Sequence, residues 1–155
     1  QLNIDKFGLN ETLDFWQDEL THFVHKNKLA FEINRDLPSN LVVEFDRDRI
    51  KQIFTNLLTN SIKYTNKPGQ VLLSASVKNQ TLVLSIEDSE PGVTDADLVN
   101  IFERLYRVES SRSRETGGSG LGLAICKSLI AEHNGTIHAE HSSLGGLKVV
   151  IKLPI

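Results

Sequence analysis

One stretch of predicted helix, residues 56–64 with the sequence NLLTNSIKY, constrains both the fold and the chemistry of this chain. At 3.6 residues per turn, Asn56, Asn60 and Lys63 fall within roughly 60° of one another. The helix must therefore bury one face and keep two carboxamides and an ammonium group on another. A solvated surface is the ordinary explanation for such a stripe, whereas a phosphate-bound divalent cation would also satisfy all three groups. The different, apolar side carries Ile53, Phe54, Leu57, Leu58 and Ser61.

Composition and charge limit the function classes. Of the 155 residues, 39% are hydrophobic and 24% charged, which is enough for one buried core. We therefore expect a single domain over residues 1–155. The formal net charge of −3 leaves no basic footprint for nucleic acid or for an anionic membrane, so nucleic acid is not an expected partner. Any anion that the chain binds must be held by a local site.

The single cysteine, Cys126, lies in an apolar segment and is expected to be a reduced, buried thiol. No apolar run approaches the roughly 18 residues of a transmembrane helix, and no signal peptide opens the chain. The chain begins at Gln1 and contains no methionine, which suggests a piece of a longer protein.

Apolar residues at helical spacing, together with capping residues, predict the helices. Asn10 would cap the first helix, whose apolar positions include Phe15 and Trp16. Asp46 would cap the helix that carries the Asn stripe. The other predicted helices are a short one over residues 94–101, capped by Thr94, and one over residues 121–132 that stops at Asn134-Gly135.

Runs of alternating apolar residues predict strands and therefore a sheet. Residues 103–118 are charged and rich in Ser and Arg without a usable period, so we expect a mobile loop there, of a length that is usually functional. The order of elements predicts helices packed on a mixed sheet, an α/β two-layer sandwich. The predicted strands cover residues 29–34, 41–45, 71–77, 82–87, 136–141 and 147–153.

A second candidate site is the turn Asp88-Ser89-Glu90-Pro91-Gly92 at the exit of a strong strand. A carboxylate at a strand end can accept a hydrogen bond from an exocyclic amine, and Gly92 leaves room for a flat ring. Taken alone, the same residues form an ordinary turn.

A third candidate site is the glycine-rich segment Gly117-Gly118-Ser119-Gly120-Leu121-Gly122-Leu123, which opens a helix. Its backbone N–H groups and the helix N-terminus could hold phosphate. It is neither a Rossmann fingerprint, since no strand precedes it, nor a Walker loop, since no Gly-Lys-Ser/Thr ends it. A lone loop of this kind is weak evidence.

The order of these features along the chain resembles the motif order of a known protein family. The Asn and Lys helix, the Asp-x-x-Pro-Gly turn, Phe102 with its loop and the Gly-x-Gly-Leu-Gly-Leu segment resemble the N, G1, F and G2 boxes of the histidine kinase catalytic and ATP-binding domain. The resemblance implies the Bergerat ATP-binding fold, a two-layer α/β sandwich of a mixed five-stranded sheet and about three helices. It also implies ATP and Mg²⁺ as ligands, with residues 103–118 as the ATP lid. The segments DSEPGV, FERLYR and GGSGLGLAICKSLIAEHNG are further similar to envelope-stress sensor kinases of the BaeS type.

The resemblance implies a role for each matching residue. Asn60 would bind Mg²⁺ through its side-chain oxygen, Asn56 would support the triphosphate region and Lys63 would neutralise phosphate charge. Asp88 would accept a hydrogen bond from the adenine amino group, with Gly92 under the ring. The other implied contacts are Tyr64 packed on the nucleotide, Phe102 anchoring the lid, Arg112 or Arg114 on the γ-phosphate, and the backbone of Gly118, Gly120, Leu121 and Gly122 around the phosphates.

Two positions depart from the family pattern. The family usually has Gly where Glu90 stands, so this turn is bulkier and more acidic, which either weakens adenine affinity or places a charge in water. After Gly146 the family usually has Thr or Ser, whereas this chain has Leu147 and Lys148. That difference puts one hydrogen bond on the adenine side in doubt.

One position on the helix of residues 56–64 also distinguishes a kinase from an ATP hydrolase. In related ATPases of the gyrase, heat-shock-90 and MutL types, a Glu one turn before the metal-binding Asn activates water, and the anti-sigma serine kinases resemble them there. Here that position is Asn56, and a carboxamide cannot take a proton. Phosphoryl transfer to an external nucleophile is therefore favoured over hydrolysis.

The expected nucleophile is a histidine outside this chain. None of the five histidines has the helical His-Glu/Asp context of a phosphate acceptor, and each is expected to be structural or exposed: His22, His25, His133, His138 and His141. The resemblance then implies a histidine on the dimerisation domain of the same homodimeric protein, a cognate response regulator, and a cytoplasmic domain of an inner-membrane sensor. The alternative is a degenerate module that binds ATP without transferring phosphate, an alternative that Glu90 keeps open.

Overall fold

Alternation along the strands builds one mixed sheet with two different faces. The computed structural model describes residues 1–108 and 122–155. In β4, Val71, Leu73 and Ala75 are buried on one face, while the residues between them lie on the other. Strand β2 runs parallel to β4, and the remaining neighbours are antiparallel. The five strands lie in the order β2 (Leu29–Asp36), β4 (Gly69–Lys78), β5 (Thr81–Ser89), β7 (Gly145–Pro154) and β6 (Thr136–His141).

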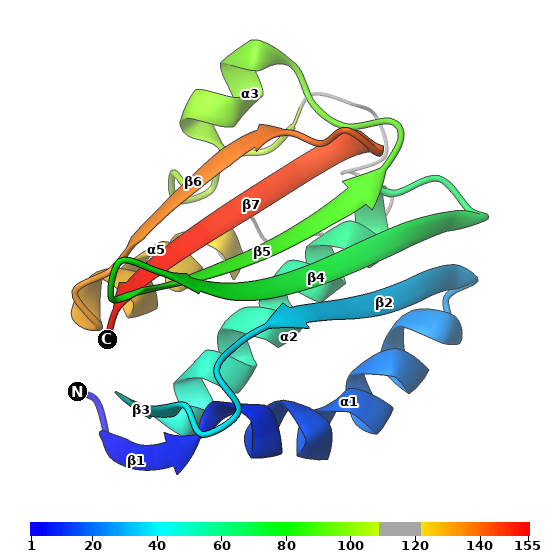
Figure 1. The fold of residues 1–155 in the computed structure, drawn as a ribbon. Helices are drawn as coiled ribbons and strands as arrows, with labels where there is room; N and C mark the ends of the chain where they lie inside the picture. The colour runs from blue at the N-terminus through cyan, green and yellow to red at the C-terminus, as the bar shows by residue number, and fades with distance from the viewer. Residues whose placement is uncertain (109–121) are drawn as a thin grey trace.

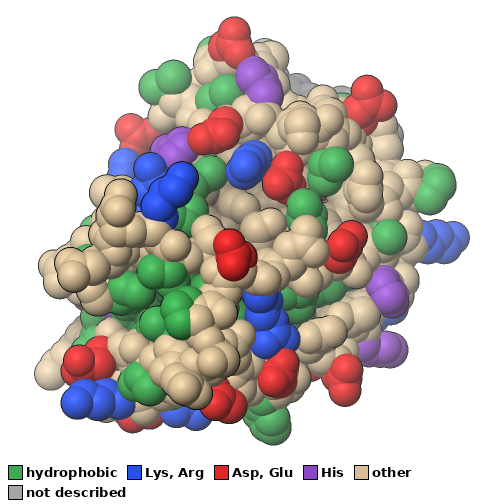
Figure 2. Space-filling view, in the orientation of Figure 1, with side chains coloured by type: hydrophobic (Ala, Val, Ile, Leu, Met, Phe, Trp, Pro, Cys, Tyr) green, Lys and Arg blue, Asp and Glu red, His purple; other side chains and the backbone are tan. Residues whose placement is uncertain are grey.

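The helices cover the apolar face of this sheet (Figure 1). Helices α2 (Arg47–Tyr64) and α5 (Gly122–Glu132) lie behind the strands in this view, α1 (Leu9–His25) lies below β2, and the short α3 (Asp95–Asn100) lies beside the β6 edge. Figure 2, in the same orientation, shows acidic, basic and histidine side chains scattered over the opposite face. The predicted two-layer α/β sandwich with a mixed five-stranded sheet is confirmed.

A second, smaller sheet departs from the sequence-based prediction. The predicted strand at 41–45 forms as β3 (Val42–Phe45), but it does not join the main sheet. Instead it pairs antiparallel with β1 (Asp5–Gly8), a strand whose four residues were too few to give a readable alternation. Among the described helices, none combines the length and the apolar character needed to cross a membrane.

The first helix begins two residues earlier than the predicted cap at Asn10 implies. It begins at Leu9 with Gly8 at the N-cap position, so the prediction of Asn10 as the cap is wrong. The Asn10 side-chain amide instead donates to the carbonyl of Pro38 at 3.0 Å. Phe15, predicted to be a core position, is 83% exposed, whereas Trp16 packs edge-on against Phe54 with ring centroids 5.9 Å apart.

Other predicted helix ends are confirmed. Asp46 caps α2, its Oδ1 accepting from the Arg49 N–H at 3.2 Å. Thr94 caps α3 within a reciprocal capping box with Asp97. After α5, Asn134 takes a left-handed conformation (φ 63°), and the Gly135 N–H returns to a carbonyl of the last turn, which ends the helix where the sequence predicted.

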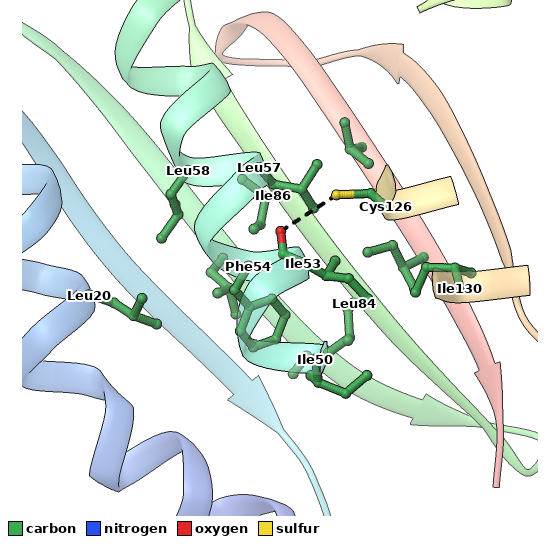
Figure 3. Close-up of a cluster of buried hydrophobic side chains, with 14 of the residues drawn as sticks. Leu20, Ile50, Ile53, Phe54, Leu57, Leu58, Leu84, Ile86, Cys126 and Ile130 are labelled. Carbon is green, nitrogen blue, oxygen red and sulfur yellow. Dashed lines mark hydrogen bonds between the residues drawn. The ribbon is translucent and has the colours of Figure 1, made fainter. Parts of the chain in front are cut away.

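The core between α2, α5 and the sheet is apolar and close-packed (Figure 3). Ile53, Phe54 and Leu57 on α2 point into it. Cys126 on α5 is fully buried there, with its thiol directed at the carbonyl of Ile53 at 3.8 Å. Burial raises the pKa of the Cys126 thiol to about 12, so the expectation of a buried, reduced thiol is confirmed.

A buried histidine joins the start of α2 to the end of α5. The Asp46 N–H donates to His133 Nε2 at 3.0 Å, so the ring hydrogen sits on Nδ1 and reaches the Leu129 carbonyl at 2.7 Å. The same ring packs edge-on against Phe45, with centroids 5.6 Å apart. His133 is therefore structural, as the sequence predicted.

Replacing His133 by Phe should lower the free energy of unfolding by about 2–3 kcal/mol, because the ring contact survives while two buried hydrogen-bonding groups lose their partner. Urea denaturation of the two proteins measures the difference. The matched control is His138→Phe, which replaces an exposed imidazole and its pair with Glu140, and it should leave the unfolding midpoint nearly unchanged. Equal effects of the two substitutions would contradict the assignment.

Candidate functional site

A cavity of about 250 Å³ opens between the second half of α2, the end of β5 and the start of α5. Ile101 and residues 106–108, within the segment 101–108, form a further wall. Phe102 is buried beside this wall but does not line the cavity. The predicted residues Arg112, Arg114, Gly118, Gly120 and Leu121, and most of the predicted lid, lie outside the described residues. The cavity brings together seven predicted site residues, Asn56, Asn60, Lys63, Tyr64, Asp88, Gly92 and Gly122.

The two faces of α2 explain this arrangement. Its apolar side packs into the core, which turns the stripe of Asn56, Asn60 and Lys63 toward the cavity. The Asn56 amide donates to the Gly122 carbonyl at 3.4 Å and so contacts the first residue of α5. Within the described ranges, the side chains of Asn60 and Lys63 have no hydrogen-bond or ion-pair partner. Their polar groups are therefore available to a ligand.

Asp88 is the buried carboxylate of the site. It is 5% exposed, and each of its oxygens accepts one hydrogen bond from the protein. Oδ2 accepts from the Ser61 hydroxyl at 2.8 Å, and Oδ1 accepts from the Leu147 N–H at 2.9 Å. The pairing of β5 with β7 shifts register between Glu87 and Ser89, so Asp88 sits at an irregularity of the sheet next to the cavity.

Burial sets the protonation of this carboxyl. Desolvation raises the pKa of Asp88 to about 6, and the nearby Glu87 adds to the rise. The hydrogen bonds from Leu147 and Ser61 act in the opposite direction and limit the shift. At neutral pH Asp88 is therefore ionised, and it is a hydrogen-bond acceptor with no proton of its own to donate.

Glycines allow the backbone to approach Asp88. A side chain at Gly146 would overlap the Asp88 carboxylate and the backbone of Ser89. Gly92 has a positive φ of 74°, and a side chain there would meet the backbone of Gly146. The sequence pattern indicated only a hairpin turn near Gly146 and assigned Ser61 to the apolar side of its helix. The contact between Ser61 and Asp88 was therefore not predicted, and the one hint in the sequence was a polar serine on the apolar side of the helix, directly after Asn60.

The two departures from the family pattern have different outcomes. Glu90 is exposed and does not line the cavity, so its charge lies in water. Lys148 lies on the other face of β7, with its Nζ 4.0 Å from the Glu87 carboxylate. Leu147 brings no hydroxyl to the site, but its backbone N–H binds Asp88.

A further contact, not predicted from the sequence, holds the wall at residues 101–108. The Tyr106 hydroxyl donates to Asp97 Oδ1 at 2.6 Å, and Tyr106 also lines the cavity. Burial alone would raise the pKa of Asp97, but hydrogen bonds from Tyr106 and Thr94 lower it below its usual value. This wall is therefore tied to α3 through the same aspartate that completes the α3 capping box.

The lining suits a ligand with an anionic part and a hydrogen-bond donor. It includes the cation of Lys63, while Asp88 is the only carboxylate among the described lining residues. Apolar side chains such as Val93, Ile101 and Leu123 give it surfaces for a flat ring. No group of three His, Cys, Asp or Glu residues in the described ranges could hold a metal by itself.

Sequence relatives are sensor kinases. The chain is 49% identical over 126 residues to the signal transduction histidine-protein kinase BaeS of Escherichia coli (strain K12), covering 81% of this chain and 27% of that protein. It is 37% identical to the sensor histidine kinase WalK of Bacillus subtilis (strain 168), covering 79% of this chain and 21% of that one. The chain thus spans about a quarter of the length of these relatives.

Solved structures agree with the sequence relatives. The catalytic domain of histidine kinase ThkA, in a nucleotide-free form, superimposes with a TM-score of 0.82 at 27% identity, covering 99% of this chain and 98% of that one. ThkA in complex with the response regulator protein TrrA matches with a TM-score of 0.78 at 26% identity, covering 97% of this chain and 41% of that one. Residues 45–155 match the family described as histidine kinase-, DNA gyrase B-, and HSP90-like ATPase. The chain belongs to this family, and its fold is that of a histidine kinase catalytic domain.

Proposed function

We propose that this chain binds ATP in the cavity and is the catalytic domain of a sensor histidine kinase, which transfers the γ-phosphate to a histidine outside the chain. The observation that carries the proposal is the ionised, buried Asp88 in the same cavity as Asn60 and Lys63. A buried carboxylate selects a ligand that donates hydrogen bonds, and an ammonium group selects one that carries negative charge. An adenine nucleotide has both properties.

Mg²⁺ fits the donor set of the site when the nucleotide supplies most of its ligands. Asn60 offers one side-chain oxygen to the cavity, and Mg²⁺ is usually bound by one or two protein groups together with phosphates and waters. When bound, the metal would neutralise charge on the phosphates. Asn60 would hold it, while Lys63 and Asn56 would face the phosphates.

The lining favours phosphoryl transfer over hydrolysis. In related ATPases the base that activates water lies one turn before the metal-binding Asn, and here that position is Asn56, which cannot take a proton. Its amide donates to the Gly122 carbonyl. Asp88, the one carboxylate among the described lining residues, is bound by Ser61 and Leu147 and is assigned to the adenine ring.

The acceptor histidine, by this proposal, belongs to the dimerisation domain of a longer, homodimeric protein. No histidine in the described part of the chain lines the cavity. His133 is buried and structural, while His138 and His141 pair with Glu140 and Asp95. The ThkA complex with TrrA supports a response regulator as the second partner. The kinship to BaeS, a signal transduction histidine-protein kinase, supports a place within a signalling protein, and we propose that this chain is the cytoplasmic domain of an inner-membrane sensor.

Asp88→Asn should weaken ATP binding by about 10- to 100-fold, because the amide group of Asn presents a donor to the adenine amine where the carboxylate presents only acceptors. Isothermal titration with ATP and GTP, each with Mg²⁺, measures the change. An unchanged preference for ATP over GTP in this variant would remove Asp88 from its assigned role.

The same substitution should change how stability depends on pH. Because the pKa of Asp88 is raised in the folded protein, its ionisation destabilises the fold fully above pH 6 and not at all below about pH 4. Relative to wild type, Asp88→Asn should therefore gain roughly 3 kcal/mol of unfolding free energy between pH 4 and pH 7. Urea titrations at both pH values test this, and a parallel pH dependence of the two proteins would contradict it.

Asn60→Asp should abolish most phosphotransfer by the parent kinase while leaving the fold intact, because an added charge and the loss of the amide disturb the metal site. Phosphohistidine formation is measured beside a thermal unfolding curve. Lys51→Ala, an exposed change on the same helix that breaks only the pair with Glu19, is the control. Wild-type turnover by Asn60→Asp would overturn the metal assignment.

The isolated chain should bind ATP, yet neither label itself nor hydrolyse ATP appreciably, because the proposed acceptor histidine lies outside it and Asn56 cannot act as a base for water. Adding the histidine-bearing dimerisation segment should restore acid-labile phosphate. Radiolabelling from γ-labelled ATP with and without that segment measures both steps. Steady hydrolysis by the chain alone would favour an ATPase, and the absence of labelling in the restored protein would favour a module that binds without transfer.

A further inference from the structure

Ser61 is a polar residue on the side of α2 where the helical spacing predicts an apolar one. It lies on the side of α2 that faces the core, where apolar residues surround it, and it is only 3% exposed. A buried hydroxyl needs a partner, and its partner is Asp88 Oδ2 at 2.8 Å. Ser61 thus contacts the carboxylate from the protein interior and does not line the cavity itself.

We infer that Ser61 is a positioning residue that orients the Asp88 carboxylate toward the cavity, and that it thereby sets a preference for 6-amino over 6-oxo purine nucleotides. This inference rests on the proposed function, since it concerns how the same cavity selects its base.

Geometry supports the positioning role. The terminal torsion of an aspartate is broad, so a carboxylate held at one oxygen can turn about its own axis. Here the Leu147 N–H holds Oδ1 and the Ser61 hydroxyl holds Oδ2, at 2.9 and 2.8 Å. Two donors on different oxygens fix the plane of the group, and the remaining lone pairs are left for a ligand.

No other described hydroxyl makes this hydrogen bond. The side chain of Leu147 is apolar. Thr65, one turn after Ser61, is 2% exposed, and its hydroxyl lies close enough to Asp88 to lower the pKa of that carboxyl, but within the described ranges it does not reach hydrogen-bond distance and angle. Ser61 is therefore the one side chain among the described residues that donates a hydrogen bond to Asp88.

The chemistry of the base explains the preference. An ionised Asp88 accepts from a 6-amino group and repels a 6-oxo group, whereas a protonated Asp88 can donate to the oxo group. Removing the Ser61 donor favours the protonated form, because one hydrogen bond to the charged form is lost. The other charged groups stay in place, with Glu87 on the same strand, Lys148 beside it, and Lys63 and Arg107 in the cavity lining.

The test measures dissociation constants of ATP and ITP, each with Mg²⁺, between pH 5 and pH 8.5. Wild type should prefer ATP, and the preference should fall as the pH drops through about 6. Ser61→Ala should move this midpoint upward by about one pH unit and lower the ATP-to-ITP preference at pH 7 about tenfold. Ser85→Ala, which removes a buried hydroxyl from the opposite face of β5, is the matched control and should change neither quantity.

Ser61→Cys keeps the shape of the side chain with a slightly larger atom and weakens the donor, so its midpoint should lie between those of wild type and Ser61→Ala. If Ser61→Ala does not fold, the midpoint of Ser61→Cys tests the role of Ser61 instead. Urea denaturation of both variants measures any effect on stability separately. A midpoint and a preference equal to those of wild type in the folded variants would overturn the inference, whatever their stability. A wild-type protein that binds neither nucleotide, or both equally, would instead overturn the proposed adenine site.

Discussion

The structure of the site depends on one buried charge, the carboxylate of Asp88. Its raised pKa corresponds to roughly 3 kcal/mol of destabilisation at neutral pH. The surroundings make that charge tolerable: the register shift in β5, the absence of a side chain at Gly146, and the two hydrogen bonds from α2 and β7. The carboxylate therefore costs the fold free energy at neutral pH, and binding of a ligand that donates hydrogen bonds would explain its presence.

The second constraint is that one helix serves both the core and the cavity. Helix α2 places Phe54 and Leu57 against the sheet, and the same rotation points Asn60 and Lys63 at the ligand. Packing of the apolar side therefore fixes the direction of the polar side. A substitution in the core of α2 that rotates the helix would misplace the phosphate-binding groups without touching them.

Patterns with a strong period were predictable from the sequence, and isolated contacts were not. The alternation in β4 and β5, the cap at Asp46 and the polar stripe of α2 led to the correct fold, and together with the family resemblance they led to seven of the residues that line the described cavity. Ser61 was assigned to the core because its position on the helix is apolar, and only the fold brings Asp88 next to it. Phe15 failed for a different reason: it lies off the three- and four-residue spacing that joins Leu13, Trp16 and Leu20, and only its apolar character placed it with them, although it points to solvent.

The hydrogen bonds of His133 have a mechanical consequence for the site. They fasten the end of α5 to the start of α2, at the ends of both helices remote from the cavity. The other end of α5 begins at Gly122, in the cavity wall. A helix of this length extends about 16 Å. If α5 tilts as a rod, His133 acts as its pivot, and a displacement of a few tenths of an ångström near the pivot grows several-fold by the time it reaches Gly122.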